Sequence, residues 1–278
     1  MTYNTDEFLS QIREAVATEQ LFLPSLPDIA VKVQQECEKP NATAQSLAEA
    51  ISIDPALSVR MLQVANSPLY RSRSLADNLQ MAITRLGLGL VKNLVISLAM
   101  KQIYKASNDV LEERFKELWL SSIKTAALSR LLTASHKELD TELAMLAGLT
   151  HNIGALPILL LAEDEDELFN APDELNKVIL HCQSEVGAHI FRAWNFPQPL
   201  IDVVSECLNF SRNNSSPADY VDVVQVALVQ GSIFTGLECP DDWSKIKAFS
   251  KLGIDGSSNI LDIEENKIIF DETQSLFK

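Results

Sequence analysis

The sequence predicts an all-α protein, and three features support this prediction. Apolar residues recur at intervals of three and four along the whole chain, which is the spacing of one face of a helix. Runs that alternate apolar and polar residues, with the β-branched enrichment of half-buried strands, hardly occur. Proline, asparagine and glycine signals divide the chain into segments of helical length.

The first three helices are predicted from their capping and breaking residues. Thr5 is expected to cap an N-terminal helix within residues 1–20, where Asp6 and Glu7 stand in place of the basic residues of a signal peptide. A second helix runs from about Pro27 to Glu38, and a third begins with Thr43 as its cap.

The fourth helix has clear signals at both ends. Asp54 followed by Pro55 indicates a capping residue and a first-turn proline. Asn66 and Ser67 precede a further proline, and their side chains are expected to bond backbone groups freed at the helix end.

The two helices that follow are predicted to meet at a glycine turn. The first starts at about Ser74 and ends at Gly87, which we expect in a left-handed conformation, with Gly89 completing the turn. The second runs from Leu90 to about Tyr104 and is so apolar that we expect it to pack on two sides. The apolar face of the first is Leu75, Leu79, Ile83 and Leu86.

The second half of the chain continues the helical pattern. Acidic residues 163–167 and the segment 170–172 indicate an exposed connection, and Ser211–Pro217 is the clearest linker. Residues from Gly253 onward are ambiguous. Helices are predicted at about 110–134, 141–150, 173–194, 199–208, 218–234 and 241–252.

Composition indicates a globular, cytoplasmic protein. With 278 residues, of which 46% are hydrophobic, the chain can fill a core without disulfides or metals. The longest uninterrupted apolar run, Ala155–Ala162, is too short to cross a bilayer, so we expect no membrane span. The four cysteines have no paired metal-ligand or redox spacing, which favours reduced residues; they are Cys37, Cys182, Cys207 and Cys239.

The charges are distributed unevenly along the chain. A net charge of −15 disfavours nucleic acid as the main partner, because binding it depends on neutralising phosphates. The segment from Arg60 to Lys105 nevertheless carries +6, against −21 elsewhere. We therefore predict a partner-binding surface there, or else ion pairs between these bases and the acids of the other half. The predicted partner-binding residues are Arg60, Arg71, Arg73 and Lys92.

Three separated motifs resemble those of the HDOD family, a degenerate branch of the HD superfamily of metal-dependent phosphohydrolases. They are LPSLP at Leu23–Pro27, ISIDPALSVRMLQVANSPLY at Ile51–Tyr70 and AITRLGLGLVKNL at Ala82–Leu94. With the later Gly-Leu-x-His and Val-Gly-Ala segments, the resemblance covers about Leu23 to Phe210. It implies an HD-like helical fold with subdomains at 21–108 and 109–212, followed by a helical extension at 213–278.

The resemblance also shows which metal ligands of the superfamily this chain has lost. Ser121 stands where the first histidine is expected, the His-Asp pair is His151-Asn152, and Cys207 falls at a later histidine position. His151 and His181 remain in register as candidate vestigial ligands. Because an amide is a much poorer ligand than a carboxylate, we expect no metal, no cofactor and no catalytic residue.

The function implied by the resemblance is a non-catalytic scaffold or output module in bacterial signal transduction. Its partner would be a signalling protein or a small ligand. One alternative is an HD-type metal-dependent phosphohydrolase or phosphodiesterase with a reduced site, and another is a nucleic-acid-binding regulator that uses the segment from Arg60 to Lys105.

Overall fold

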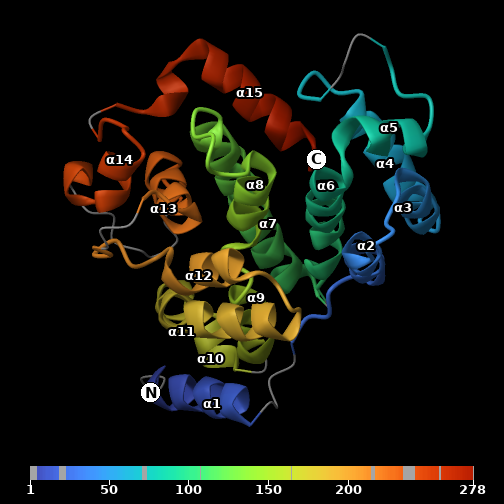
Figure 1. Ribbon diagram of the computed structural model, residues 1–278. Helices are drawn as coiled ribbons and strands as arrows, with labels where there is room; N and C mark the ends of the chain where they lie inside the picture. The colour runs from blue at the N-terminus through green and yellow to red at the C-terminus, as the bar shows by residue number, and fades with distance from the viewer. Residues whose placement is uncertain are drawn as a thin grey trace.

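Helices account for all the regular secondary structure in the described part of the chain. The computed structural model describes residues 5–18, 23–70, 74–106, 108–163, 165–213, 217–233, 242–256 and 258–277. These residues form α-helices and short 3-10 helices and contain no strand, which confirms the predicted all-α class (Figure 1).

The N-terminal half is organised around one apolar helix, α6 (Leu88–Met100), which continues into η1 (Lys101–Ile103). Helix α6 contacts α2 and α4 in its own half and α8 of the other half, which confirms the expectation of packing on two sides. Most of its residues are buried, from Val91 to Met100. The other helices of this half are α2 (Asp28–Glu38), α3 (Ala44–Ile51), α4 (Pro55–Ala65) and α5 (Leu79–Leu86).

Two of the predicted helix caps are confirmed by their hydrogen bonds. The hydroxyl of Thr43 accepts from the backbone N–H of Ser46 at 3.1 Å, and Ser46 returns a bond to complete a capping box. The Asp54 carboxylate accepts from the backbone N–H of Leu57 at 3.0 Å, and Pro55 is the first residue of α4.

The predicted start of the next helix at Ser74 is wrong. Helix α5 begins five residues later, at Leu79, with Asn78 as its cap, and Leu75 is 63% exposed. The cause is Asn66. Its side-chain oxygen accepts from the backbone N–H of Ala76 at 2.7 Å, and its side-chain nitrogen donates to the backbone carbonyl of Ala76 at 3.0 Å. Because these backbone groups are occupied, residues around Ala76 cannot enter a helix; Asn66 therefore anchors the following loop instead of only closing α4.

Gly87 joins α5 directly to α6, and the two helices turn by 115° there. Its φ of 85° confirms the predicted positive value, but its ψ of 153° lies outside the left-handed helical region. This combination is essentially restricted to glycine. Gly89 lies inside α6 and is not part of the turn.

Gly87→Val is expected to lower the free energy of unfolding by about 1–3 kcal/mol, because a β-branched residue is strained at this φ and ψ. Denaturant melts measure the loss. Gly89→Val is the matched control, since the same substitution falls two residues later in open space inside a helix. Equal losses in the two variants would contradict this role of Gly87.

The C-terminal half is built on the long helix α7 (Asp109–Thr133), which packs along α8 (Thr141–Thr150). The expected exposed connection after the apolar run contains a short helix, α10 (Asp166–Phe169), because Leu168 is fully buried. The predicted helix 241–252 consists, where described, of η2 (Trp243–Lys245) and α14 (Lys247–Lys251). The remaining helices are α9 (Ala155–Ala162), α11 (Pro172–Ala193), α12 (Gln198–Glu206), α13 (Tyr220–Gln230), η3 (Ile260–Asp262) and α15 (Glu264–Ser275).

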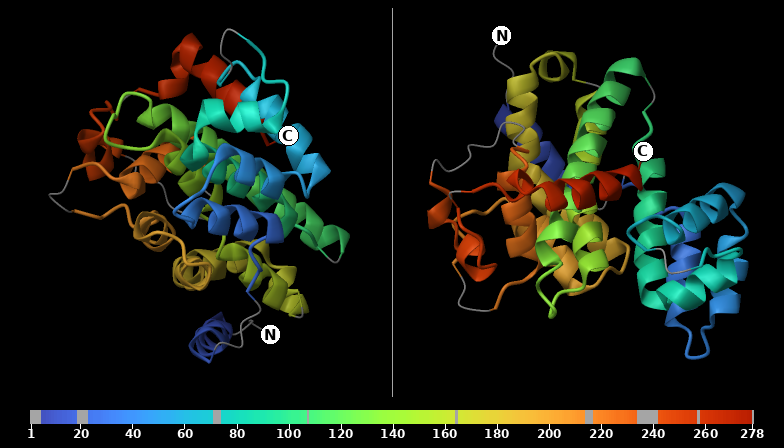
Figure 2. Two further views of the ribbon diagram at one scale, coloured as in Figure 1. Left: turned by 45° about the vertical axis from the view of Figure 1, so that its right-hand side comes forward. Right: turned by 90° about the horizontal axis from the view of Figure 1, so that it is seen from above.

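The N-terminal helix packs on the C-terminal half, whereas the C-terminal helix packs mainly on α7 of its own half and reaches Arg60 of the N-terminal half at its end. Helix α1 (Thr5–Ala17) buries Phe8 and Ile12 and contacts α11, below the rest of the molecule in Figure 1. Helix α15 crosses α7 and extends toward the N-terminal half, as Figure 2 also shows. The predicted capping role of the Thr5 side chain lies outside the described residues.

Among the described residues, the helical stretch Thr141–Ala162, which comprises α8, the turn after it and α9, is long and apolar enough to cross a membrane. Helices α5 and α6 with η1 would be a second if the bent pair counted as one span. In the structure, 89% of the apolar window in Thr141–Ala162 is buried inside the protein, as in the core helix of a globular domain.

Candidate functional site

Three of the residues that the family resemblance aligns with metal-ligand positions line a small cavity between α7, the α8–α9 turn and α11. This HD-like pocket is lined by Ser121, His151, Asn152, Asn176 and Gln183, among others. Its volume is about 90 Å³. Small-molecule sites usually measure about 300–1,000 Å³, so the cavity has room for a few waters but not for a nucleotide.

Two glycines of the GLTHNIG segment let the α8–α9 turn lie tightly between α7 and α11. A Cβ atom on Gly148 would lie 2.7 Å from the carbonyl oxygen of Thr125 in α7. A Cβ atom on Gly154 would lie 2.0 Å from the carbonyl oxygen of Gln183 in α11. These close approaches fix His151 and Asn152, which lie between the two glycines.

Asn152 is a hydrogen-bonded residue in the wall of the pocket. Its side-chain oxygen accepts from the Ser122 hydroxyl at 2.9 Å and from the Tyr104 hydroxyl at 3.3 Å. Its side-chain nitrogen donates to the Leu118 carbonyl at 3.3 Å. The Ser122 and Tyr104 hydroxyls lie against the oxygen that a metal would need, so Asn152 acts as a structural link between the α8–α9 turn, α7 and the residue that follows η1.

His151 is buried and neutral. Its Nδ1 atom lies 2.7 Å from the Gly148 carbonyl oxygen, which can only accept, so Nδ1 carries the proton and Nε2 keeps its lone pair. Burial lowers the pKa of His151 to about 4, although the bond to Gly148 opposes this shift.

The depressed pKa of His151 predicts a loss of stability in mild acid. Between about pH 6.5 and pH 4 the unfolded chain binds a proton that the native histidine does not, so unfolding becomes more favourable as the pH falls. The expected loss is on the order of 3 kcal/mol. Denaturant melts across this range should show a smaller loss for His151→Asn than for the wild type and for the control His136→Asn. Equal losses in all three proteins would refute this assignment.

The other two candidate positions do not contribute ligands to this pocket. His181 is exposed on α11 and its Nε2 atom accepts from Arg13 of α1 at 3.0 Å, whereas its neighbours on α11 line the cavity. Cys207 is 1% exposed, and burial raises the pKa of its thiol to about 12, so it stays protonated. Leu208, not Cys207, lines the cavity.

The donor set therefore does not fit the divalent metal of the HD superfamily. The first histidine position is a hydroxyl, the carboxylate position is a hydrogen-bonded amide, and the thiol at Cys207 is protonated. Among the residues that the structure describes, no cluster of three or more His, Cys, Asp or Glu side chains could hold a metal ion.

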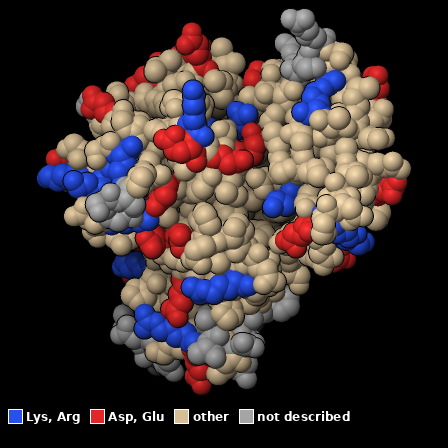
Figure 3. Space-filling model, in the orientation of Figure 1, with Lys and Arg blue, Asp and Glu red and all other residues tan. Residues whose placement is uncertain are grey.

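The two predicted partner-binding residues that the structure describes, Arg60 and Lys92, line different hollows. Arg60 donates to the carbonyls of Ser275 and Leu276, at 3.2 and 2.8 Å, and is held against the end of α15. Lys92 lines a cleft between the two halves, as does Asp140. Arg71 and Arg73 lie outside the described residues. The face shown in Figure 3 carries basic and acidic side chains interspersed, without a large patch of one sign.

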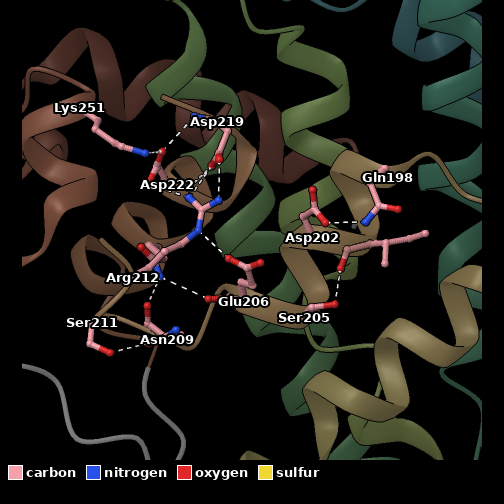
Figure 4. Close-up of polar contacts among 12 residues, drawn as sticks. Gln198, Asp202, Ser205, Glu206, Asn209, Ser211, Arg212, Asp219, Asp222 and Lys251 are labelled. Carbon is pink, nitrogen blue, oxygen red and sulfur yellow. Dashed lines mark hydrogen bonds and ion pairs between the residues drawn. The ribbon is translucent and has the colours of Figure 1, made fainter. Parts of the chain in front are cut away.

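A partly buried ion-pair network is centred on Arg212, just after α12. Figure 4 shows Arg212 among the carboxylates of Glu206, Asp219 and Asp222, at 2.7, 2.7 and 3.2 Å. Lys251 of α14 bonds the other oxygen of Asp222 at 2.8 Å. Burial raises the pKa of Asp222, and the bond from Lys251 opposes this shift. This network, which was not predicted from the sequence, ties α12, α13 and α14 together.

Comparisons with known proteins agree with the architecture. The HDOD domain profile matches residues 23–209. A crystal structure from Shewanella amazonensis, of a protein provisionally described as a metal-dependent phosphohydrolase, is 27% identical with a TM-score of 0.87, and 99% of each chain is covered. An HDOD domain protein of unknown function from Geobacter sulfurreducens has a TM-score of 0.67 at 20% identity, again over 99% of each chain.

A curated relative extends beyond the length of this chain. An uncharacterized protein of Treponema pallidum is 27% identical over 193 residues, which is 66% of this chain and 37% of the relative. The chain thus spans little more than a third of that protein. The profile match covers about two thirds of the present sequence and includes all three motifs identified above. The chain belongs to the HDOD domain family.

Proposed function

We propose that this protein is a non-catalytic signal-transduction module that acts by binding another protein or a small ligand. The main evidence for the proposal is the hydrogen bonding of the Asn152 side chain. A catalytic HD site needs a carboxylate there to hold a metal and activate water, and this chain has an amide whose oxygen already accepts two hydrogen bonds.

The similarity of the fold to that of a protein with a described role adds weaker support for this proposal. A protein from Marinobacter aquaeolei, provisionally described as a signal transduction protein, shares the fold with a TM-score of 0.66 at 19% identity; 98% of this chain and 65% of that chain are covered. At this identity the likeness supports the fold, and the signalling role is our extension of it.

The second candidate is a metal-dependent phosphohydrolase with a reduced site. It is favoured by the resemblance to the Shewanella amazonensis protein and by His151, whose neutral Nε2 atom retains a lone pair in a residue that lines the pocket. One histidine without a neighbouring carboxylate is a weak metal site, so we rank this function second.

Metal analysis and a hydrolysis assay decide between the two functions. The purified protein, before and after incubation with Mn²⁺ or Mg²⁺, is expected to hold no stoichiometric metal and to leave a chromogenic phosphodiester intact. One tightly held metal per chain, with hydrolysis that His151→Ala abolishes and the control His189→Ala retains, would establish the phosphohydrolase instead.

A further inference from the structure

A groove on the boundary between the two halves combines positive charge with an apolar floor. This lysine groove is bounded by Lys101, Lys105, Lys116 and Leu120, with Trp119 and Phe277 in its floor. Its volume is about 650 Å³, and it shares Lys101, Trp119 and Phe277 with a second hollow of about 290 Å³ that extends to Arg60. Together they form an elongated depression.

The three lysines of the groove are available to an external partner. Each is exposed, and none makes an ion pair or a side-chain hydrogen bond with any described residue. Basic residues elsewhere, such as Arg212 and Lys251, are satisfied by carboxylates. Glu112 is the one acid that lines the groove, so the rim is positive on a chain of net charge −15. A rim of this kind attracts an acidic partner.

The floor of the groove suits an apolar or aromatic side chain. Leu120 is 51% exposed at its edge, and the Trp119 ring lies in contact with the rings of Tyr104 and Phe277, at centroid distances of 5.0 and 6.2 Å. A wall of packed aromatic rings is the usual setting of an interface anchor residue.

The chain's own residues 275–277 show how a peptide is held beside this groove. The carbonyl oxygens of Ser275 and Leu276 accept from the Arg60 guanidinium, at 3.2 and 2.8 Å, while Phe277 places its ring edge-on against Trp119. These contacts join main-chain carbonyls to a basic side chain and an aromatic ring to an aromatic floor. A peptide supplies both features, whereas a simple anionic amphiphile has no main chain.

We propose that the lysine groove binds an acidic peptide segment of a partner protein, with an aromatic or leucine side chain on the floor and carboxylates against the rim lysines. This inference rests on the proposed function, because it supplies the protein-binding surface that a non-catalytic module requires. Three of the basic residues that the sequence placed between Arg60 and Lys105 meet here, and α7 adds Lys116.

The test uses a short fluorescein-labelled peptide in which one phenylalanine and one leucine stand among aspartates and glutamates. Fluorescence anisotropy should show binding to the full chain that weakens with added salt. Lys101→Glu with Lys116→Glu should weaken binding about tenfold or more at low ionic strength. The matched control is Lys137→Glu with Lys247→Glu, which changes the net charge equally at exposed sites outside the groove and should bind like the wild type.

Two further readouts locate the bound peptide. Binding should change the fluorescence of Trp119, and Trp119→Phe should remove that signal. A peptide with serine in place of its phenylalanine and leucine should bind about tenfold more weakly, since the floor contact is lost. Unchanged melting temperatures in the lysine variants would show that the fold is intact.

Three outcomes would overturn the proposal. The first is that the peptide does not bind. The second is that the groove variant and its control bind the peptide equally. The third is that dodecanoate binds where the peptide fails, which would make the groove a site for a small amphiphile. Hydrolytic activity would defeat the proposed function alone, because neither substituted lysine lies in the HD-like pocket.

Discussion

Gly154→Ala is expected to lower the free energy of unfolding by about 3 kcal/mol or more, the upper part of the range for overpacked cores. The added Cβ atom would lie 2.0 Å from the Gln183 carbonyl oxygen, 2.7 Å from the Gly187 nitrogen and 2.8 Å from the Gln183 carbonyl carbon. All three atoms belong to the backbone of α11, so no side-chain rotation relieves the clash. The helix itself must shift.

The matched control for this variant is Gly89→Ala. Gly89 lies inside α6 with no atom within 4 Å of an added Cβ, so alanine there should stabilise the protein by about 0.5–1 kcal/mol. Denaturant melts compare the two. If Gly154→Ala unfolds at the wild-type midpoint, the close approach between the α8–α9 turn and α11 is not a constraint on the fold.

Arg212→Ala is expected to cost about 3 kcal/mol, at the low end of the range for breaking a buried ion pair. The Asp222 side chain is 3% exposed and would retain only Lys251 as a charged partner, while Asp219 would be left beside it without its ion pair to Arg212. The loss should persist at high salt, because buried pairs are weakly screened.

The control for Arg212 is an exposed pair, Lys177 with Glu174, at 2.8 Å on the surface of α11. Lys177→Ala should leave the free energy of unfolding close to that of the wild type, because solvent screens an exposed pair. Thermal or denaturant melts measure both variants. Similar small effects at the two positions would show that the Arg212 network does not hold the linker.

Local signals account for the parts of the fold that were predicted correctly. Thr43 and Asp54 cap helices by contacts within three residues, so their roles can be read directly from neighbouring positions. The role of Asn66 could not, because its partner Ala76 lies ten residues away and the contact exists only once the loop has folded. The same holds for Arg212, whose bonds to Asp219 and Asp222 span the linker.

The candidate site was predicted in part. The family resemblance matched Ser121, His151 and Asn152 to metal-ligand positions, and in the structure all three line one cavity. Helical spacing also contained a signal that was missed: residues 176, 179, 180 and 183 of α11 share the face that lines the cavity, and His181 falls off that face. Tyr104 and Ser122 could not be assigned to Asn152, since those contacts join three separate segments of the chain.

The crossed packing of the terminal helices has a consequence for how the chain folds. The contact between Arg13 and His181 spans 168 residues, and the contact between Arg60 and Leu276 spans 216 residues. A contact between residues so far apart in sequence has a large cost in loop-closure entropy. This cost is offset only after the intervening helices have assembled. Docking of α1 and α15 should therefore be a late step in folding. An intermediate that stops before this step would expose the apolar side chains of Ile12 and Phe277 and would be prone to aggregate.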